Sequence, residues 1–384
     1  MNIVDPILFQ AKIIPDGIAI CTPGAAMESV TYGSLVHMMN NVGRMALSLG
    51  LVRGNVVAIS IKDQILHAAV MLGLTQLGVV TVSAGAALPA ELGVQLLITD
   101  GAAASPHVGR VVVADAGWTI GAGRPIADEV AHQVGKDDTC RIILTPAASG
   151  ALKGIAVSHD NAWRRNARYA FVNGNRFPRC SRVYCDFALG TGPSFQYLIH
   201  MLCKGGTIYL PGDGPESVLQ ALDLYKIEGL VATPAGLLQY VTFFESQSVF
   251  QCSFDVILCW GGSLGESLSE RVCARMGANV FSTYGAPETG ALAVGSVHVL
   301  AGISGAVGVL APDALAQTVD PAGSPLGPGQ EGAIRFRTPQ TVAEYVGNAD
   351  ESEKAFRQGW FHSGEIGHLR EDRLLVIAGR NRQA

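Results

Sequence analysis

A loop of small residues between two apolar segments is the first place in this chain where nucleotide chemistry is feasible. The loop reads Thr145-Pro-Ala-Ala-Ser149-Gly150-Ala-Leu-Lys153-Gly154. Small side chains let backbone N–H groups approach phosphate oxygens, and a lysine adds a positive point charge. The loop lacks the GxxxxGK[ST] pattern of a Walker A motif. Taken alone, it is better explained as a small-residue hairpin that carries a surface lysine.

Residues further along the chain have the chemistry to hold the rest of a nucleotide. The pair Gly261-Gly262 permits a ligand to lie against the backbone, and Tyr284 offers an aromatic face on which a purine can stack. Glu288 offers a carboxylate to Mg²⁺, an ion that prefers few protein oxygens together with phosphates. In isolation, Tyr284 is equally explained as a core aromatic and Glu288 as a solvated loop acid.

The elements that must position these residues alternate between short apolar strands and helical segments, which predicts α/β layers. Expected strands are 55–60, 96–99, 110–115, 141–145 and 154–158, and further short ones follow before residue 300. Asp160 and Asn161 are expected to cap a helix through 162–171. From about residue 301, segments such as EGAIRFRT and RLLVIAG predict a smaller β-rich subdomain with few helices.

One uncharged stretch requires a test for membrane insertion. No Asp, Glu, Lys or Arg lies between Asp63 and Glu91, and a spanning helix needs about 20 predominantly apolar residues. Polar residues interrupt the stretch, and its pattern changes at Gly78 from helical to the strand-like VVTVS. We therefore expect a buried helix followed by a buried strand, and no membrane span.

Composition excludes other classes of protein. The chain has 27 Lys and Arg against 32 Asp and Glu, a net charge of −5, so it offers no basic field for nucleic acid. Its eight cysteines form no C-x-x-C pair, and its N-terminus lacks the pattern of a signal peptide. These features predict a reduced, cytoplasmic protein with buried thiols.

Four segments occur in the order found in a known family. The loop at 145–154 is followed by His159 and Asn161, and the segment resembles the T-S-G-T-T-G-x-P-K-G and His-x-Asn motifs of the ANL superfamily of adenylate-forming enzymes, which includes the acyl-CoA synthetases. The segment from CWGGSL to TYGAPETG resembles the family's G-G-x-x-L to Y-G-x-T-E. The segment from GQEGAIRFR to GWFHSGE is similar to G-E-x-G-E-I, G-Y-x-N and F-x-x-G-W-F-x-T-G-D, and VIAGR matches the closing Gly-Arg.

The resemblance implies a role for each matching residue. Thr145, Ser149, Gly150 and Lys153 would hold phosphates, and Glu288 would serve Mg²⁺, with Lys153 and Glu288 the two catalytic candidates. The remaining nucleotide contacts would come from Gly262 and Ser263 beside the adenine, Tyr284 stacked on it, Gly285 next in the chain, Glu365 at the ribose, and Arg380 at the ribose or phosphate.

The resemblance also implies the architecture. It predicts a large adenylating domain with α/β regions at 1–138 and 139–300, a β-rich region at 301–375 and the approach to a hinge at 376–384. The family's C-terminal lid, which carries a catalytic lysine, is not expected within these 384 residues.

Several positions depart from the family pattern. Pro146, Ala147 and Ala148 replace residues of the phosphate loop, and Pro287 replaces the threonine of Y-G-x-T-E. Proline removes an N–H donor, and each lost charge-assisted phosphate contact costs about 1.5–3 kcal/mol. Glu365 stands where the family has aspartate, and FALGTGPSF lacks the histidine often found near the acyl pocket.

Two readings from different classes stay open. The first is an AMP-forming ligase that uses ATP and Mg²⁺ to activate a small carboxylic acid and passes it to coenzyme A or to the phosphopantetheine of a carrier protein, with little turnover expected of a chain without the lid. The second is a non-catalytic nucleotide- or acyl-binding relative. Apolar pocket candidates near Phe195, Tyr240, Trp260 and Gly285 favour an aliphatic or aromatic acid over an amino acid. A dinucleotide-binding oxidoreductase is disfavoured because no G-x-G-x-x-G follows a first strand.

Overall fold

The computed structural model divides the chain into two compact units, which are described separately. It describes residues 1–380 except 25–27, 84–87, 102–106, 122, 125, 127–133, 147–149, 173–176, 213–217, 219–221, 223, 247–252 and 278. The first unit comprises Met1–Asn166, Ser181–Ala221 and Tyr345–Asn348, and the second comprises Ala167–Cys180, Leu222–Glu344 and Ala349–Ala384.

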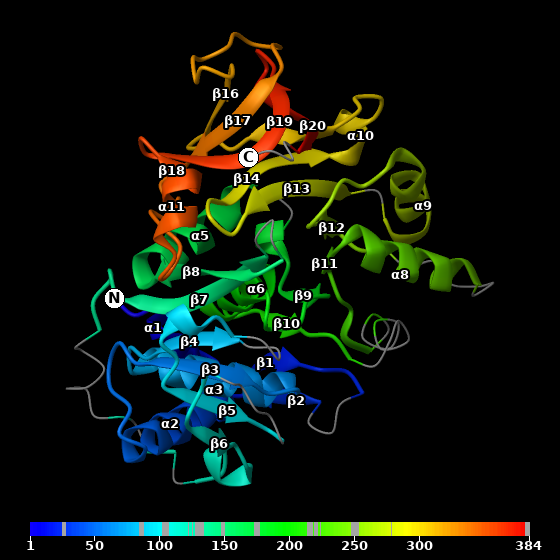
Figure 1. Ribbon diagram of the computed structural model, residues 1–384. Helices are drawn as coiled ribbons and strands as arrows, with labels where there is room; N and C mark the ends of the chain where they lie inside the picture. The colour runs from blue at the N-terminus through cyan, green and yellow to red at the C-terminus, as the bar shows by residue number, and fades with distance from the viewer. Residues whose placement is uncertain are drawn as a thin grey trace. The chain divides into compact units, whose positions relative to one another are not determined.

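Both units mix helices and strands (Figure 1). The elements of the first unit are α1 (Asp5–Ile13), β1 (Ile18–Cys21), β2 (Ser29–Thr31), α2 (Tyr32–Ser48), β3 (Val56–Ser60), α3 (Gln64–Gln76), β4 (Val80–Ser83), η1 (Ala90–Leu92), β5 (Leu96–Thr99), β6 (Val111–Val113), η2 (Ala116–Trp118), β7 (Thr139–Pro146), β8 (Leu152–Ser158), the start of α5 (His159–Val172), β9 (Arg182–Cys185), α6 (Gly192–Cys203) and β10 (Thr207–Tyr209).

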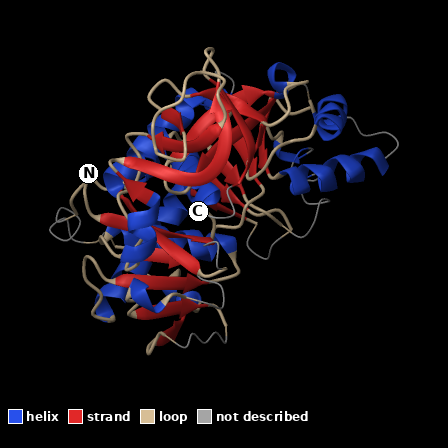
Figure 2. Ribbon diagram, turned by 45° about the horizontal axis from the view of Figure 1, so that its top comes forward, coloured by secondary structure: helices blue, strands red, loops and turns tan. Residues whose placement is uncertain are grey.

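The second unit begins within α5. The strands of both units are drawn in red in Figure 2. Its further elements are η3 (Phe177–Arg179), β11 (Gly229–Ala232), α8 (Pro234–Ser246), β12 (Val256–Cys259), α9 (Glu266–Met276), β13 (Val280–Ala286), β14 (Gly290–Ser296), α10 (Val297–Leu300), β15 (Ala306–Leu310), β16 (Leu315–Val319), β17 (Gly332–Arg337), α11 (Ala349–Ala355), β18 (Phe356–Arg357), β19 (Trp360–Leu369) and β20 (Leu374–Arg380).

Strand order explains where loops can meet ligands. In the first unit, one sheet has the order β6-β5-β3-β4-β7-β8, in which all neighbours are parallel except β7 and β8. In the second unit, β11, β12 and β13 are parallel, and β14, β15, β20, β19, β17 and β16 continue the same sheet. Antiparallel pairing begins between β13 and β14. The fold class predicted from the sequence, mixed α/β with a β-rich C-terminal region, is confirmed.

Local predictions are confirmed in the uncharged stretch. Residues Gln64–Gln76 form α3 and Val80–Ser83 form β4, and both are almost fully buried. Helix α3 approaches α2 so closely that a Cβ on Gly73 would lie 2.7 Å from the Met39 carbonyl oxygen. Within the described residues, no helix is long and apolar enough to cross a membrane.

The polar core of the first unit is built around Arg141, whose side chain is 1% exposed. Its Nη2 donates to Ser83 Oγ at 2.6 Å and to the Leu189 carbonyl at 2.9 Å. His67 lies on the other side of Ser83, with Nε2 2.7 Å from the hydroxyl and Nδ1 3.1 Å from the Ile61 carbonyl. Burial, reinforced by Arg141, lowers the pKa of His67 to about 4, so the imidazole is neutral at pH 7.

The predicted start of α5 was wrong by a few residues. The helix begins at His159, and the hydroxyl of Ser158 accepts a hydrogen bond from the Asn161 N–H at 3.1 Å. Ser158 therefore has the position of the capping residue, and Asp160 and Asn161 already lie in the first turn. Asp160 instead pairs with Arg164 one turn later, at 2.6 Å.

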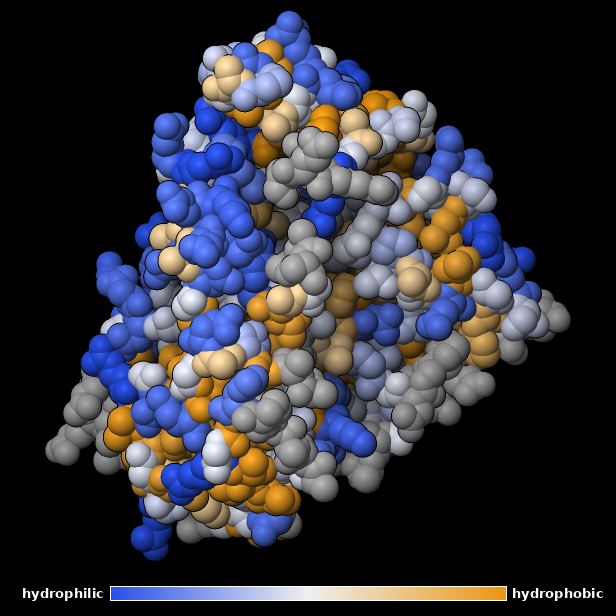
Figure 3. All heavy atoms as spheres, viewed as in Figure 1, coloured by the Kyte–Doolittle hydropathy of each residue, from blue (hydrophilic) through white to orange (hydrophobic). Residues whose placement is uncertain are grey.

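The surface mixes polar and apolar side chains, and most of the described thiols are buried, as predicted. Hydrophilic and hydrophobic side chains are interspersed over the face shown in Figure 3, and α11, which buries none of its residues, contributes charged ones. None of the described cysteines forms a disulfide bond, and five of them are buried: Cys21, Cys140, Cys180, Cys185 and Cys259. Burial raises the pKa of the Cys140 thiol to about 12, so at pH 7 almost none of it is in the nucleophilic thiolate form.

Candidate functional site

The small-residue loop connects two antiparallel strands of the first unit, as predicted. In the register of β7 and β8, Thr145 is the partner of Lys153, so the two candidate phosphate ligands are cross-strand neighbours. Gly150 in the loop is exposed and has φ +83°, a conformation that favours glycine. Ser149 lies outside the described residues, together with Ala147 and Ala148.

Lys153 is engaged by a residue to which the sequence had assigned no role. Its Nζ lies 4.0 Å from the centroid of the Tyr345 ring, a cation–π contact within the first unit. The chain around Tyr345 is fixed on β8, because the Val346 N–H donates to the Gly154 carbonyl at 2.8 Å. Gly347 follows with φ +66°, and a Cβ there would lie 2.7 Å from the Glu91 Cβ. Tyr345 therefore limits where the ammonium group can point.

The second unit brings together three of the predicted nucleoside residues. Glu365 on β19 pairs with Arg380 on β20 in the antiparallel register, so their side chains leave neighbouring strands. The hydroxyl of Tyr284, on β13, donates a hydrogen bond to the Glu365 carboxylate. The Tyr284 ring also packs against Phe336, with centroids 6.0 Å apart and planes inclined by 55°. Tyr284, Glu365 and Arg380 thus form one cluster, which we call the nucleoside cluster.

The protonation state of Tyr284 follows from its surroundings. Burial raises the pKa of its hydroxyl far above the ordinary value, the negative charge of Glu365 and the hydrogen bond to it add to the effect, and Arg380 opposes it. The hydroxyl therefore keeps its proton throughout the physiological range and acts as the donor to Glu365. The Tyr284 hydroxyl occupies one acceptor position of the Glu365 carboxylate, and the other acceptor positions stay available for further hydrogen bonds.

Glu288 lies in the tight connection between β13 and β14, and its side chain is 6% exposed. Its carbonyl accepts from the Val342 N–H at 2.9 Å, and the Thr338 hydroxyl donates to the next carbonyl, that of Thr289, at 3.0 Å. Among the described residues, no group of three or more His, Cys, Asp or Glu side chains could form a metal site. A single hard carboxylate fits Mg²⁺ that is held mainly by phosphates and water.

The predicted glycine positions are consistent with close backbone approach. Gly262 and Ser263 lie exposed in the loop after β12, directly after Gly261, whose φ is +83°. Gly285 follows Tyr284 in β13, and a Cβ there would lie 2.4 Å from the Gly290 carbonyl oxygen. Only glycine fits at Gly285, because the two strands meet at this point without room for a side chain.

The apolar residues proposed for an acyl pocket are buried within their units. Phe195 in α6 lies beneath the Arg141 guanidinium, 5.2 Å from its Cζ to the ring centroid. In the second unit, Trp260 stacks on Tyr169 at a centroid distance of 6.0 Å and an angle of 17°, and Tyr240 is 5% exposed. These contacts show well-packed aromatic positions and leave their role toward a substrate a prediction.

Fold and sequence together place this chain in a family of AMP-binding enzymes. The AMP-binding enzyme family matches residues 10–346, and the chain belongs to it. The N-terminal domain of FACL13 from Mycobacterium tuberculosis has the same fold, with a TM-score of 0.85, 20% identity and 99% coverage of both chains. The o-succinylbenzoate coenzyme A synthetase of Bacillus subtilis in complex with AMP gives a TM-score of 0.84, 18% identity and 98% coverage of both chains.

The relatives found by sequence are longer than this chain, which matches only part of each of them. The chain is 27% identical to a feruloyl-CoA synthase of Amycolatopsis sp, over 64% of this chain and 50% of that protein. It is 22% identical to the 2-succinylbenzoate–CoA ligase of Bacillus mycoides (strain KBAB4), over 97% of this chain and 77% of that protein. The chain spans about half the length of relatives such as the feruloyl-CoA synthase.

Proposed function

We propose that this chain is the nucleotide-binding large part of an AMP-forming acid–thiol ligase. Its family membership and the names of its relatives, which are CoA synthases and ligases, support this function. The observation that carries the proposal is the nucleoside cluster, because the residues matched to the family's adenine and ribose motifs lie in contact although Tyr284 and Glu365 are 81 positions apart.

The reaction has two displacement steps. A carboxylate oxygen of the acid attacks the α-phosphorus of ATP, the bond to the β-phosphate breaks, and pyrophosphate leaves. The sulfur of coenzyme A, or of a carrier's phosphopantetheine, then attacks the acyl carbon, AMP leaves, and the thiol proton passes to solvent. Such in-line transfer depends on positioning and charge stabilisation more than on covalent help from the protein.

Each residue of the site has a proposed part in these steps. Lys153, Thr145, Ser149 and Gly150 would bind phosphates, and Gly262, Ser263, Tyr284, Gly285, Glu365 and Arg380 would bind the nucleoside. Glu288 would hold Mg²⁺, which neutralises phosphate charge when bound. Buried free thiols support a cytoplasmic location.

ATP–pyrophosphate exchange with a panel of aliphatic and aromatic acids, run on the full-length product of the gene, tests the proposal. Exchange with one acid is expected to fall about 100-fold or more in Lys153→Met, as for other lost transition-state contacts. Lys12→Met, which alters an exposed lysine of α1, is the matched control and keeps the wild-type rate. If the wild-type protein does not bind AMP, the proposed nucleotide-binding site is wrong.

The second candidate, a non-catalytic nucleotide- or acyl-binding relative, has one observation in its favour. Pro146 ends β7 beside the phosphate loop, and Pro287 precedes Glu288, so both sites lack an N–H donor that other residues would supply. AMP binding without exchange for any acid, measured on the full-length product of the gene, would favour this function. Measurable exchange would exclude it.

A further inference from the structure

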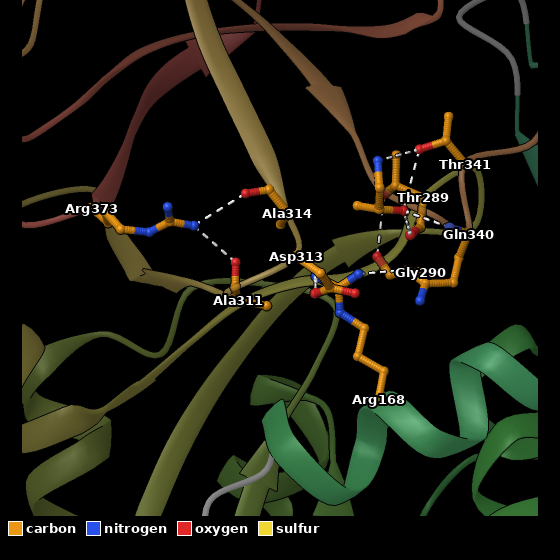
Figure 4. A network of polar contacts seen from close by, with 10 residues as sticks. Arg168, Thr289, Gly290, Ala311, Asp313, Ala314, Gln340, Thr341 and Arg373 are labelled. Carbon is orange, nitrogen blue, oxygen red and sulfur yellow. Dashed lines mark hydrogen bonds and ion pairs between the residues drawn. The ribbon is translucent and has the colours of Figure 1, made fainter.

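A network of polar contacts in the second unit joins α5 to the backbone that carries Glu288 (Figure 4). Arg168 is its centre, with a side chain that is 4% exposed. Its Nη1 donates to Gln340 Oε1 at 2.5 Å, and its Nη2 lies 3.0 Å from Asp313 Oδ1 in an ion pair. The guanidinium thus connects two turns that are far apart in the sequence, one at 338–342 and one at 311–314.

The turn at 338–342 is closed by its own hydrogen bonds. The Gln340 N–H donates to Thr338 Oγ1 at 3.1 Å, the Thr338 N–H donates to Thr341 Oγ1 at 2.8 Å, and the Thr341 N–H donates back to the Thr338 carbonyl at 3.1 Å. Because the turn is internally hydrogen-bonded, holding the Gln340 side chain in place also restricts the positions of Thr338 and Val342.

These two ends of the turn hold the Glu288 backbone. The Val342 N–H binds the Glu288 carbonyl, and the Thr338 hydroxyl binds the Thr289 carbonyl. Thr289 is fully buried, and its N–H donates to the Ala286 carbonyl at 3.1 Å. Two consecutive carbonyls are therefore held from one side, which fixes the direction in which the Glu288 side chain leaves the backbone.

The other end of the Arg168 bridge is also rigid. The turn at 311–314 is closed by the Ala314 N–H, which donates to the Ala311 carbonyl at 3.0 Å. Arg373 Nη2 donates to the Ala311 carbonyl at 2.9 Å and to the Ala314 carbonyl at 3.1 Å. Figure 4 shows Arg373 reaching this turn, while Arg168 approaches Asp313 and Gln340 from the helix. Arg168 is held between two fixed points.

Stability alone does not explain a buried arginine here. Asp313 is 45% exposed, so the pair gains less attraction than a buried pair, whereas burying the guanidinium carries a desolvation cost. Neither Nε nor Nη2 of Arg168 makes a hydrogen bond among the described residues, so Nη2 contributes only its ion pair with Asp313. What the contacts define is the position of a planar fork that lysine could not reproduce.

We propose that Arg168 is a positioning residue for Glu288. It anchors Gln340, Gln340 fixes the 338–342 turn, and that turn fixes the backbone from which the Glu288 carboxylate meets Mg²⁺. This inference rests on the proposed function, in which Glu288 serves the metal. Without Arg168 the carboxylate samples more orientations, and more Mg²⁺ is needed to reach the same occupancy.

Calorimetric titration of the whole 384-residue chain with ATP, at a series of Mg²⁺ concentrations and without acid, measures this effect apart from turnover. In Arg168→Met, the Mg²⁺ concentration that gives half of the metal-dependent gain in ATP affinity is expected to rise about 10-fold, the lower end of the effect of losing a residue that orients a metal ligand. Metal-free AMP affinity stays within about twofold, because the nucleoside cluster is untouched. Arg271→Met, which removes a partly exposed arginine of α9 that pairs with Glu245 outside this network, is the matched control and shifts neither quantity.

A second variant protects the test against misfolding. Thr338→Val removes the hydroxyl that binds the Thr289 carbonyl but keeps the shape and the Arg168 charge, and it is expected to shift the Mg²⁺ requirement in the same direction. An unchanged requirement in both variants, or an equal loss of metal-free AMP affinity, would overturn the inference. If the wild type itself gains no ATP affinity from Mg²⁺, the proposed role of Glu288 fails too, and the wild-type titration alone shows it.

Discussion

The hydrogen bond between Tyr284 and Glu365 leads to a prediction that separates the stability of the second unit from nucleotide binding. Tyr284→Phe deletes only the donor. A hydrogen bond to a charged, part-buried group is worth about 1.5–3 kcal/mol. The free energy of unfolding at pH 7 is therefore expected to fall by this amount, because the Glu365 carboxylate loses a donor while the ring and its contact with Phe336 remain.

A double-mutant cycle assigns the loss to this pair. Urea unfolding is measured for the wild type, Tyr284→Phe, Glu365→Ala and the double variant. In the Glu365→Ala background, removing the hydroxyl is expected to cost little, so the coupling energy approaches the full 1.5–3 kcal/mol. Additive effects of the two substitutions would show that the two side chains do not interact in solution.

Nucleotide affinity is expected to follow the ring and not the hydroxyl. AMP titrations of Tyr284→Phe should stay within about threefold of the wild type, whereas Tyr284→Ala should lose the stacking contribution of about 1–3 kcal/mol. Equal losses in the two variants would refute the idea that the aromatic face is the binding element.

Two further predictions concern stability. Burial and Arg141 lower the pKa of His67 from 6.5 to about 4, so between these pH values the unfolded state binds a proton that the folded state does not. The free energy of unfolding is therefore expected to fall by up to about 3 kcal/mol as the pH drops from 6.5 toward 4. Urea midpoints measured from pH 7.5 to 4.5 should depend less steeply on pH in His67→Gln than in the wild type, and equal pH dependence would contradict this assignment. At Gly305 (φ +76°) an added Cβ would lie 2.3 Å from the Ile377 carbonyl oxygen, whereas Gly329 (φ +75°) faces open space. Gly305→Ala should lower the free energy of unfolding by more than about 3 kcal/mol, and Gly329→Ala by about 1–2 kcal/mol. Similar urea midpoints in the two variants would refute the clash at Gly305.

The fold was predictable where the pattern was local. The uncharged stretch divides into Gln64–Gln76 and Val80–Ser83 as predicted, because Gly78, with φ +74°, interrupts the helix and the Val and Thr residues after it favour a strand. The start of α5 was less predictable, since Ser158, Asp160 and Asn161 are all acceptable caps and only the backbone conformation decides among them.

The site was predictable to the extent that motifs carry it. Glycine, tyrosine and acid at the right spacing indicated the nucleoside cluster, but single-sequence reasoning had no means to show that the Tyr284 hydroxyl reaches Glu365. The contact between Arg168 in α5 and Gln340 in the 338–342 turn joins residues 172 positions apart and belongs to no sequence pattern, so only the three-dimensional structure reveals it. Tyr345 was missed for the same reason.

The cluster also bears on the most conspicuous substitution in the chain. Glutamate in place of aspartate at position 365 adds one methylene, which must displace the carboxylate or bend the side chain. In the structure the carboxylate meets the Tyr284 hydroxyl, so the added length is used in a contact between two strands of one sheet. A carboxylate has about four acceptor sites, and one hydroxyl donor uses one of them. The remaining sites suffice for the two ribose hydroxyls, so the substitution by itself does not argue against nucleotide binding. What distinguishes a ligase from a binding relative therefore lies at the phosphates, with Lys153, Pro146 and Glu288, and not at the nucleoside.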